Sequence, residues 1–253
     1  MSPTQGVKTA DTMFRIVDAL QELGGARVTE LSDHLDVGKS TIYRHLTALG
    51  ENRYVVKEGD VYHLGLKFLE RGHYAQNRAP VYRMARPVVE ELAAETNERC
   101  QFVVMEHHRG VYVHVASGER GVETDTQVGH PFELHATSCG KAILAHLPER
   151  ELSDVIEERG LQALTAHTVT DEALLREELD EVRERGYAVN REGRIEGLCS
   201  VGVPVIGQAG QVLGALSVSA PAGRMRGEWF EETLPDTLLG AADELKLRVQ
   251  YVR

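Results

Sequence analysis

Polar and aromatic side chains line one side of a helix that the sequence predicts from about residue 39 onward. Ile42, Leu46 and Leu49 recur at helical spacing, so we expect them on one buried face. Successive residues of a helix rotate by about 100°, and the opposite face therefore presents an ammonium, hydroxyls, a phenol and a guanidinium, from Lys39, Ser40, Thr41, Tyr43, Arg44 and Thr47. Such groups bind phosphate oxygens and base edges, and Arg is the commonest specific partner of guanine in the major groove. The pattern predicts contact with DNA.

A second helix and a turn precede this face. Thr29 is a good N-cap for a short helix that ends near Leu35. Residues 36–38 follow as a turn in which Gly38 can adopt a positive φ. An amphipathic helix over residues 10–23 comes before both. The spacing predicts a helix-turn-helix.

A hairpin pattern follows the helices. Residues 54–57 and 61–64 alternate as strands around a turn at Gly59, which completes a winged helix-turn-helix. Arg53 and Lys57 add positive charge beside the polar helix face. The alternative is a small helical hairpin whose outward polar residues are only solvated.

The remainder of the chain alternates between strand and helix patterns. Further helices are expected over residues 64–77 and 81–97, the second with Pro87 at its start or at a kink. Short strands are expected near residues 101–105, 111–115, 187–189, 200–206 and 212–219, and helices over 138–147, 171–185 with Thr170 as N-cap, and 228–249. Helices over an antiparallel sheet predict an α+β domain.

Composition narrows the class of protein. The chain has 253 residues, of which 42% are hydrophobic and 26% charged, as in ordinary globular proteins. No apolar run approaches the roughly 20 residues that span a bilayer, and no signal-peptide core is present, so we expect a cytoplasmic protein without a membrane partner. Cys100, Cys139 and Cys199 are too widely spaced for a disulfide framework or a zinc motif, which predicts free thiols and no metal or cofactor.

The net charge of −11 is unusual for a DNA-binding chain. Residues 1–75 carry 9 Lys and Arg against 10 Asp and Glu, whereas residues 76–253 carry 19 against 29. The excess negative charge therefore lies away from the predicted DNA face, where Lys8, Arg44, Arg53 and Lys57 can still form a local basic patch. With only six lysines, the composition resembles that of proteins from salt-loving organisms. An ordinary acidic surface is the alternative.

Motifs along nearly the whole chain resemble those of the IclR-type transcriptional regulators. The first half shows Lys39-Ser40-Thr41, Arg44, Tyr54-Val55 and Tyr62-His63-Leu64-Gly65, as in that family's winged domain. The second half shows Leu134-His135-Ala136-Thr137 before Gly140-Lys141-Ala142, Gly186-Tyr187-Ala188 before Gly197 to Val205, and a closing strand from Gly214 to Pro221. The resemblance implies a winged domain over 1–75, a linker helix over 76–88 and a GAF-like effector-binding domain with an antiparallel sheet over 89–253.

The resemblance also implies where an effector would bind. It places a pocket beside the helix start at residues 136–141, whose backbone N–H groups and dipole suit a carboxylate or phosphate. The pocket residues it implies are Phe132, Ser138, Cys139, Asn190, Cys199, Ser217 and Ser219. Alternatively, Ser138 only caps its helix, and Ser217 and Ser219 face solvent. The family usually has acidic residues where Asn190 and Gly193 stand, and their loss makes this wall less repulsive to an anion.

Three other functions were compared with this one. A phosphate-binding loop at Gly140-Lys141 fails because His135 and Ala142 replace its first Gly and its Ser or Thr. Cys139 and Cys199 could act as a thiol sensor or, together with His135, as a metal site. The alternative is that they are only small buried hydrophobic residues, as free Cys often is. A small-molecule-processing enzyme would need a catalytic constellation that the spacing does not show. His107, His108 and His114 are expected on the surface, and we predict no catalysis.

We therefore expect a homodimer, or a tetramer built from it, that binds double-stranded operator DNA. A small polar, carboxylate-bearing metabolite in the C-terminal domain would change the affinity for the operator. The regulator would act as a repressor or an activator.

Overall fold

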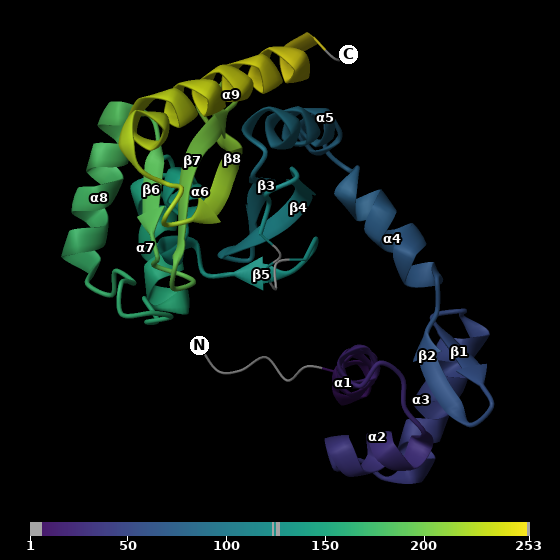
Figure 1. Ribbon diagram of the computed structural model, residues 1–253. Coiled ribbons are helices and arrows are strands. Elements are labelled where there is room, and N and C mark those ends of the chain that lie inside the picture. The colour runs from purple at the N-terminus through teal and green to yellow at the C-terminus, as the bar shows by residue number, and fades with distance from the viewer. Residues whose placement is uncertain (1–6, 123, 125–126, 252–253) are drawn as a thin grey trace. The chain divides into compact units, whose positions relative to one another are not determined.

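The computed structural model describes residues 7–122, 124 and 127–251. They divide into two compact units, the first ending at Ala75 and the second beginning at Gln76 (Figure 1). Each unit has its own hydrophobic core.

The first unit contains three helices followed by a two-stranded hairpin and a fourth helix. Its elements are α1 (Lys8–Glu22), α2 (Val28–Leu35), α3 (Lys39–Glu51), β1 (Val55–Glu58), β2 (Val61–Leu64) and α4 (Lys67–Gln76). The apolar stripes predicted for α1 and α3 meet in one core, where Ile16, Leu20, Ile42 and Leu46 are almost fully buried. The predicted winged helix-turn-helix fold is confirmed.

Two local predictions in this unit were wrong. The α2 helix begins one residue before Thr29, and the Glu30 carboxylate accepts a hydrogen bond from the Arg27 N–H at 2.6 Å, which satisfies one donor at the helix start. The left-handed turn residue is Asp36, with φ 54°, whereas Gly38 has φ −56°. Asp is among the few side chains that adopt this conformation readily, so a Gly was not required.

A six-stranded antiparallel sheet forms the centre of the second unit. Its strands are β3 (Arg99–Glu106), β4 (Arg109–Ser117), β5 (Pro131–Phe132), β6 (Ala188–Arg191), β7 (Leu198–Ile206) and β8 (Val212–Pro221), in the spatial order β5-β4-β3-β8-β7-β6. Helices α5 (Pro80–Thr96) and α9 (Leu234–Tyr251) pack on one face, and α6 (Ser138–Leu144) packs on the other (Figure 1). Helices α7 (Glu149–Arg159) and α8 (Glu172–Arg185) complete that second layer. The predicted α+β class is confirmed.

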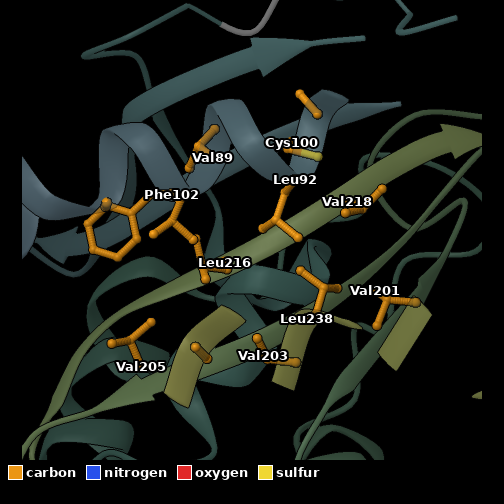
Figure 2. Packing of buried hydrophobic residues seen from close by; sticks show 14 of the residues in the cluster. Val89, Leu92, Cys100, Phe102, Val201, Val203, Val205, Leu216, Val218 and Leu238 are labelled. Atoms are coloured by element: carbon orange, nitrogen blue, oxygen red, sulfur yellow. The ribbon is translucent and has the colours of Figure 1, made fainter. Parts of the chain in front are cut away.

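Strand alternation separates two kinds of side chain. On β7, Cys199, Val201, Val203 and Val205 face α5 and α9. Figure 2 shows Val201, Val203 and Val205 packed with apolar side chains of β3 and β8. The residues between them face α6, because successive side chains of a strand point to opposite faces. One face of the sheet is therefore continuously apolar, and the other is available for polar groups.

The expected linker helix over 76–88 differs from the observed helices. α4 ends at Gln76, and α5 begins at Pro80 and continues without interruption past Pro87 to Thr96. Val81, Ala85, Val88 and Val89 are buried in the core beneath α5. A helix with one fully buried face belongs to the domain that covers it, so α5 is part of the second unit. Pro80 occupies the first helical turn, where its missing N–H leaves no hydrogen bond unmade.

The remaining helix predictions differ in detail. Asp171, rather than Thr170, caps α8, and its carboxylate accepts from the Leu174 N–H at 3.0 Å. The α7 helix was not predicted. Gly186 ends α8 with φ 84°, as expected for a C-terminal stop. Within the described ranges, no helix combines the length and apolar character needed to cross a membrane.

Two glycines allow α6 to approach its neighbours closely. A Cβ on Gly140 would lie 2.5 Å from the Leu134 Cα and closer still to its carbonyl oxygen. A Cβ on Gly202 of β7 would lie 2.6 Å from the Cys139 nitrogen. The start of α6 is thus held directly against the sheet, and backbone would have to move to admit any larger residue.

Replacing Gly140 with Ala should destabilise the second unit by about 1 to 3 kcal/mol, the usual cost of overpacking. Gly240→Ala is the matched control, because Gly240 lies in α9 with nothing within 4 Å of its absent Cβ and should be neutral or slightly stabilising. Urea unfolding followed by the fluorescence of Trp229, the single tryptophan, reports on this unit. Equal stability of Gly140→Ala and the wild type would contradict the close packing.

Candidate functional site

The outward face of α3 is exposed as its spacing predicts. Ser40, Tyr43 and Arg44 are exposed, while Ile42 and Leu46 on the opposite side are buried. Tyr43 exposes 57% of its surface, which is unusual for an aromatic side chain that serves only to pack. This face therefore presents a phenol, a hydroxyl and a guanidinium to a partner.

Hydrogen bonds hold the turn before α3. The Ser32 hydroxyl donates to the Val37 carbonyl at 2.7 Å, and the Arg15 Nη2 donates to the Leu35 carbonyl at 2.9 Å. Both bonds satisfy carbonyls at or just after the end of α2, which lack partners within the helix. They fix the direction in which α3 leaves the turn.

The other predicted DNA-binding residues surround this face. Lys39 and Thr47 are exposed on α3, and Thr41 is half-buried. The Thr47 hydroxyl donates to the Tyr43 carbonyl at 2.9 Å, so it has only lone pairs left for a partner. Arg53 is exposed directly after α3. Lys57 is exposed on β1, with its Nζ 5.5 Å from the centroid of the Tyr62 ring.

A row of polar side chains crosses the sheet face that α6 covers. Arg99 on β3 pairs with Ser219 on β8, Ser219 pairs with Ser200 on β7, and Ser200 pairs with Asn190 on β6. Residues paired in this way lie on the same face of a sheet. All four are buried, and they form one continuous polar row across four strands.

A second row lies beside the first. Gln101 pairs with Ser217, which in turn pairs with Gly202. The Ser217 hydroxyl donates to the Gln101 Oε1 at 2.7 Å, and the Gln101 Nε2 donates to the Ser219 Oγ at 3.3 Å. These bonds fix the positions of the side chains, as buried polar groups require.

The start of α6 closes over these rows at Gly202. The Ser138 hydroxyl donates to the Ser200 Oγ at 2.7 Å, across the gap between helix and sheet. A cavity of about 40 Å³ remains between them. A water needs at least about 10 to 15 Å³ by this measure, so the cavity can hold a few waters or one small polar group. We call it the inner cavity.

Positive charge lines the inner cavity. Arg99 and Arg194 both border it, and Arg99 is 7% exposed. The Arg194 guanidinium carbon lies 5.6 and 5.4 Å from the ring centroids of Tyr112 and Phe132, and its Nη1 donates to the Tyr112 hydroxyl. Aromatic rings attract a guanidinium through their faces and help to fix its orientation. The arrangement favours an anion.

Five of the seven residues predicted to bind an effector line the inner cavity, namely Ser138, Cys139, Asn190, Ser217 and Ser219. Cys199 was placed wrongly: it precedes Ser200 on β7 and so faces the apolar core on the opposite side of the sheet. Phe132 does not border the cavity either. Its ring packs against Tyr112, with centroids 4.4 Å apart, and lies beneath the Arg194 guanidinium, and both of these residues line the cavity. The two serines on β8 are buried and do not face solvent.

The start of α6 contributes less than the sequence suggested. Thr137, rather than Ser138, caps the helix, and its Oγ1 accepts from the Gly140 N–H at 3.0 Å. With only seven residues, α6 also has little dipole. The charge in the cavity therefore comes from the arginines.

Sequence reasoning missed Arg99, Gln101, Ser200 and Arg194. The signal for the first two was a charged and an amide residue two positions apart at the start of an otherwise apolar strand, which places both on one face. Ser200 lies between two core residues of β7 and follows from the same alternation. Arg194 lies in the loop 192–197, where no periodic pattern exists.

Burial determines the chemistry of the cysteines. It raises the pKa of Cys100 to about 12, and it raises the pKa of Cys139 and of Cys199 as well. A raised pKa lowers the fraction of reactive thiolate, so none of these thiols resembles an activated redox sensor. In the described part of the chain, no three His, Cys, Asp or Glu side chains are grouped so that they could hold a metal ion.

One histidine differs from its expected surface position. His107 is exposed, but His114 is 7% exposed. The His114 Nε2 lies 2.6 Å from the Tyr82 carbonyl oxygen, and burial lowers its pKa, which favours the neutral ring. His135 is similarly buried beside the Gln162 carbonyl, with a lowered pKa. Both serve packing within the second unit.

A winged helix-turn-helix joined to a domain with a buried polar cavity defines a class, the ligand-responsive DNA-binding regulators. Comparison with known proteins agrees with this class. Residues 73–246 match the family model described as "Bacterial transcriptional regulator IclR C-terminal", and residues 11–57 match "Bacterial regulatory protein, arsR family". The chain belongs to the IclR family of transcriptional regulators.

Individual relatives cover between 65% and 97% of the chain. The probable HTH-type transcriptional regulator ArcR of Halobacterium salinarum is 33% identical over 93% of this chain and 91% of its own length. The crystal structure of the Thermotoga maritima IclR covers 97% of this chain and 100% of that chain, at 28% identity and a TM-score of 0.83. A double mutant of the PobR inducer-binding domain from Acinetobacter, in complex with 3-hydroxybenzoic acid, covers 65% of this chain and 96% of that chain, at 28% identity and a TM-score of 0.59.

Alkylation of the native protein should be slow at all three cysteines. At pH 8 a thiol with a pKa of about 12 is ionised to about one part in 10⁴, against about one in 10 at the ordinary value of 9.0, so Cys100 should react about 1,000-fold more slowly than an ordinary thiol. The rate should rise as the pH is raised toward 12. Iodoacetamide labelling and peptide mass spectrometry, with urea-unfolded protein as the control, measure this. Fast labelling of native Cys139 would instead favour a thiol sensor.

Arg44→Ala should reduce discrimination between operator and random DNA by about 1 to 3 kcal/mol, because a bidentate Arg–base contact has about that value. The operator can be identified by enriching bound sequences from a random duplex pool. Fluorescence anisotropy then measures the affinities for operator DNA and for random DNA. Arg150→Ala, an exposed arginine of α7, is the control. If Arg44→Ala weakens both DNAs equally, Arg44 contacts only phosphates.

Proposed function

We propose that this regulator responds to a small carboxylate that binds in the inner cavity. The observation that carries the proposal is the pair of arginines, Arg99 and Arg194, on the wall of a buried cavity that is otherwise lined mainly by hydroxyl and amide groups. Arginine binds carboxylates through two parallel hydrogen bonds, and burial strengthens such bonds. Ser138, Ser217 and Ser219 are in place to orient the carboxylate and its substituents.

The known relatives support a carboxylate as the effector but do not identify which one. The PobR domain is in complex with 3-hydroxybenzoic acid, which carries a carboxyl group and a hydroxyl. In this chain the inner cavity has about 40 Å³, enough for the carboxylate group of such a molecule but not for its ring. Binding therefore requires the rest of the ligand to occupy other space, or the cavity to widen.

Arg99→Gln should weaken the binding of 3-hydroxybenzoate, or of another carboxylate found by screening, by about 10- to 100-fold. This corresponds to the 1.5 to 3 kcal/mol of a charge-assisted hydrogen bond. Isothermal titration calorimetry measures the affinity, and Arg150→Gln controls for the loss of one positive charge. If the affinity of a correctly folded Arg99→Gln variant equals that of the wild type, Arg99 does not bind the carboxylate.

A homodimer is the second part of the proposal, and an apolar surface of the first unit supports it. Leu66, just before α4, and Leu69 and Tyr74 within it are 84%, 69% and 73% exposed, and α4 has no buried residue. Phe68 of α4 packs edge-on against Tyr54, the residue before β1, with ring centroids 5.0 Å apart. A ten-residue helix is only marginally stable in water, so a second copy of the chain that covers this surface would stabilise it.

Leu69→Glu should weaken the dimer, because it would place a carboxylate in the apolar surface. Analytical ultracentrifugation should show a dissociation constant at least tenfold higher than that of the wild type. Leu174→Glu, at a leucine of α8 that is 56% exposed, is the matched control and should leave the dimer unchanged. An unaffected Leu69→Glu dimer would place the subunit contact elsewhere.

The dimer and the effector together explain regulation. Two copies of α3 can enter successive major grooves of a near-palindromic operator only at a fixed separation. An effector that binds one dimer arrangement more tightly than the other shifts the population between them and so changes operator affinity. No bond need be made or broken in the effector, and recovery of the carboxylate unchanged after incubation with the protein would distinguish this function from an enzyme.

A further inference from the structure

A second cavity lies on the other side of Asn190. It has a volume of about 280 Å³ and is bordered by α8, β6, Lys141 of α6 and the loop around His167. Two hydrogen bonds secure that loop, from the Thr165 Oγ1 to the Glu192 carbonyl at 2.8 Å and from the Thr168 Oγ1 to the Gly193 carbonyl at 2.6 Å. We call this space the outer cleft.

Lys141 is the most buried charge in the outer cleft. It is 6% exposed and forms an ion pair with the Glu178 Oε2 at 2.5 Å. An ammonium group has three donors, and Glu178 is the one partner found for Lys141 among the described residues. The lining of the cleft contains three basic side chains, Lys141, Arg185 and Arg191, and two carboxylates, Glu178 and Glu181. Within a unit that carries a net negative charge, the cleft thus has a net positive wall.

Asn190 is the one described residue that borders both spaces. Its side chain is 6% exposed, and no hydrogen bond to its amide is found among the described residues. An amide on a cavity wall that makes no hydrogen bond to protein is available to a ligand or to ordered water. A Cβ on Gly193 would lie 2.5 Å from the Asn190 Oδ1, so the glycine is what allows the amide to lie here. The amide offers both donors and an acceptor between the two spaces.

The volumes of the inner cavity and the outer cleft indicate which part of a ligand each could hold. The inner cavity, at about 40 Å³, accepts a carboxylate and little more. The outer cleft is seven times larger and begins at the same amide. An effector held by Arg99 and Arg194 would therefore extend past Asn190 toward Lys141, where a second negative group would meet the buried ammonium.

We propose that the inner cavity and the outer cleft are two compartments of one effector site, which takes an elongated ligand with an acidic group at each end. The inference rests on the proposed function, since the first acid occupies the arginine site. Asn190 would turn aside to let the chain of the ligand pass and then hydrogen-bond to it.

Titration of the full chain with two series of linear acids tests this. One series is the dicarboxylates from succinate to azelate, and the other is the monocarboxylates of equal carbon number. At the length that reaches Lys141, the dicarboxylate should bind at least tenfold more tightly than its monocarboxylate. Equal affinities at every length would overturn the two-compartment site and leave the carboxylate effector intact. If neither series binds but 3-hydroxybenzoate does, the two-compartment site is wrong and the proposed function stands, whereas failure of every carboxylate would overturn both.

Two substitutions locate the second acid. Glu178→Gln removes the partner of Lys141 and should raise the affinity for the best dicarboxylate several-fold. The affinity for the matching monocarboxylate should rise less. Glu177→Gln, the same change at an exposed neighbour on α8, is the control and should change neither. Lys141→Met should reduce the affinity for the dicarboxylate to that for the matching monocarboxylate. If that variant does not fold, Glu178→Gln decides, and an unchanged ratio between the two acids would overturn the role of Lys141.

Discussion

Side chains alternate between the two faces of an antiparallel sheet, and in the second unit this alternation determines both stability and binding. On β3, β7 and β8 the residues that face α5 and α9 are apolar and form one core. Their neighbours along each strand face α6, and at one end of the sheet these neighbours are polar: Arg99 and Gln101, Ser200, and Ser217 and Ser219. Buried polar groups need partners, and Gln101, Ser217 and Ser219 hydrogen-bond to one another. The same strands that bury the core therefore build the site.

Close packing at glycine completes that site. Gly202 lets the backbone of Ser138 and Cys139 rest directly on β7, and Gly140 lets α6 pack on the turn before it. The cavity that remains is small, and its positive charge comes from two arginines rather than from the helix start. An anion that enters would interact with β3, β7, β8 and the loop 192–197 at once. Such a ligand can shift the equilibrium between two arrangements of the protein, provided that it binds one of them more tightly.

Much of this structure could be predicted from sequence. Apolar periodicity located α1, α3 and α8 and most strands, and motif resemblance placed Ser138, Cys139, Asn190, Ser217 and Ser219 near one another. Errors arose where neighbouring residues compete for one role: Asp171 rather than Thr170 caps α8, and Asp36 rather than Gly38 takes the positive φ. Cys199 was assigned to the pocket although Ser200, one residue on, faces it. The register between strands, which aligns Arg99 with Ser219, Ser200 and Asn190, could not be obtained from any one segment, because it depends on contacts between residues far apart in the sequence.

Coupling between an effector site and an operator site is reciprocal, so each ligand changes the affinity for the other by the same factor. The decisive measurement therefore has two parts. The affinity for operator DNA is measured with and without a saturating carboxylate, and the affinity for the carboxylate is measured with and without operator DNA. Both affinities should change by the same factor, about 5- to 150-fold for typical allosteric coupling. A carboxylate that binds the inner cavity but leaves the operator affinity unchanged would contradict this coupling.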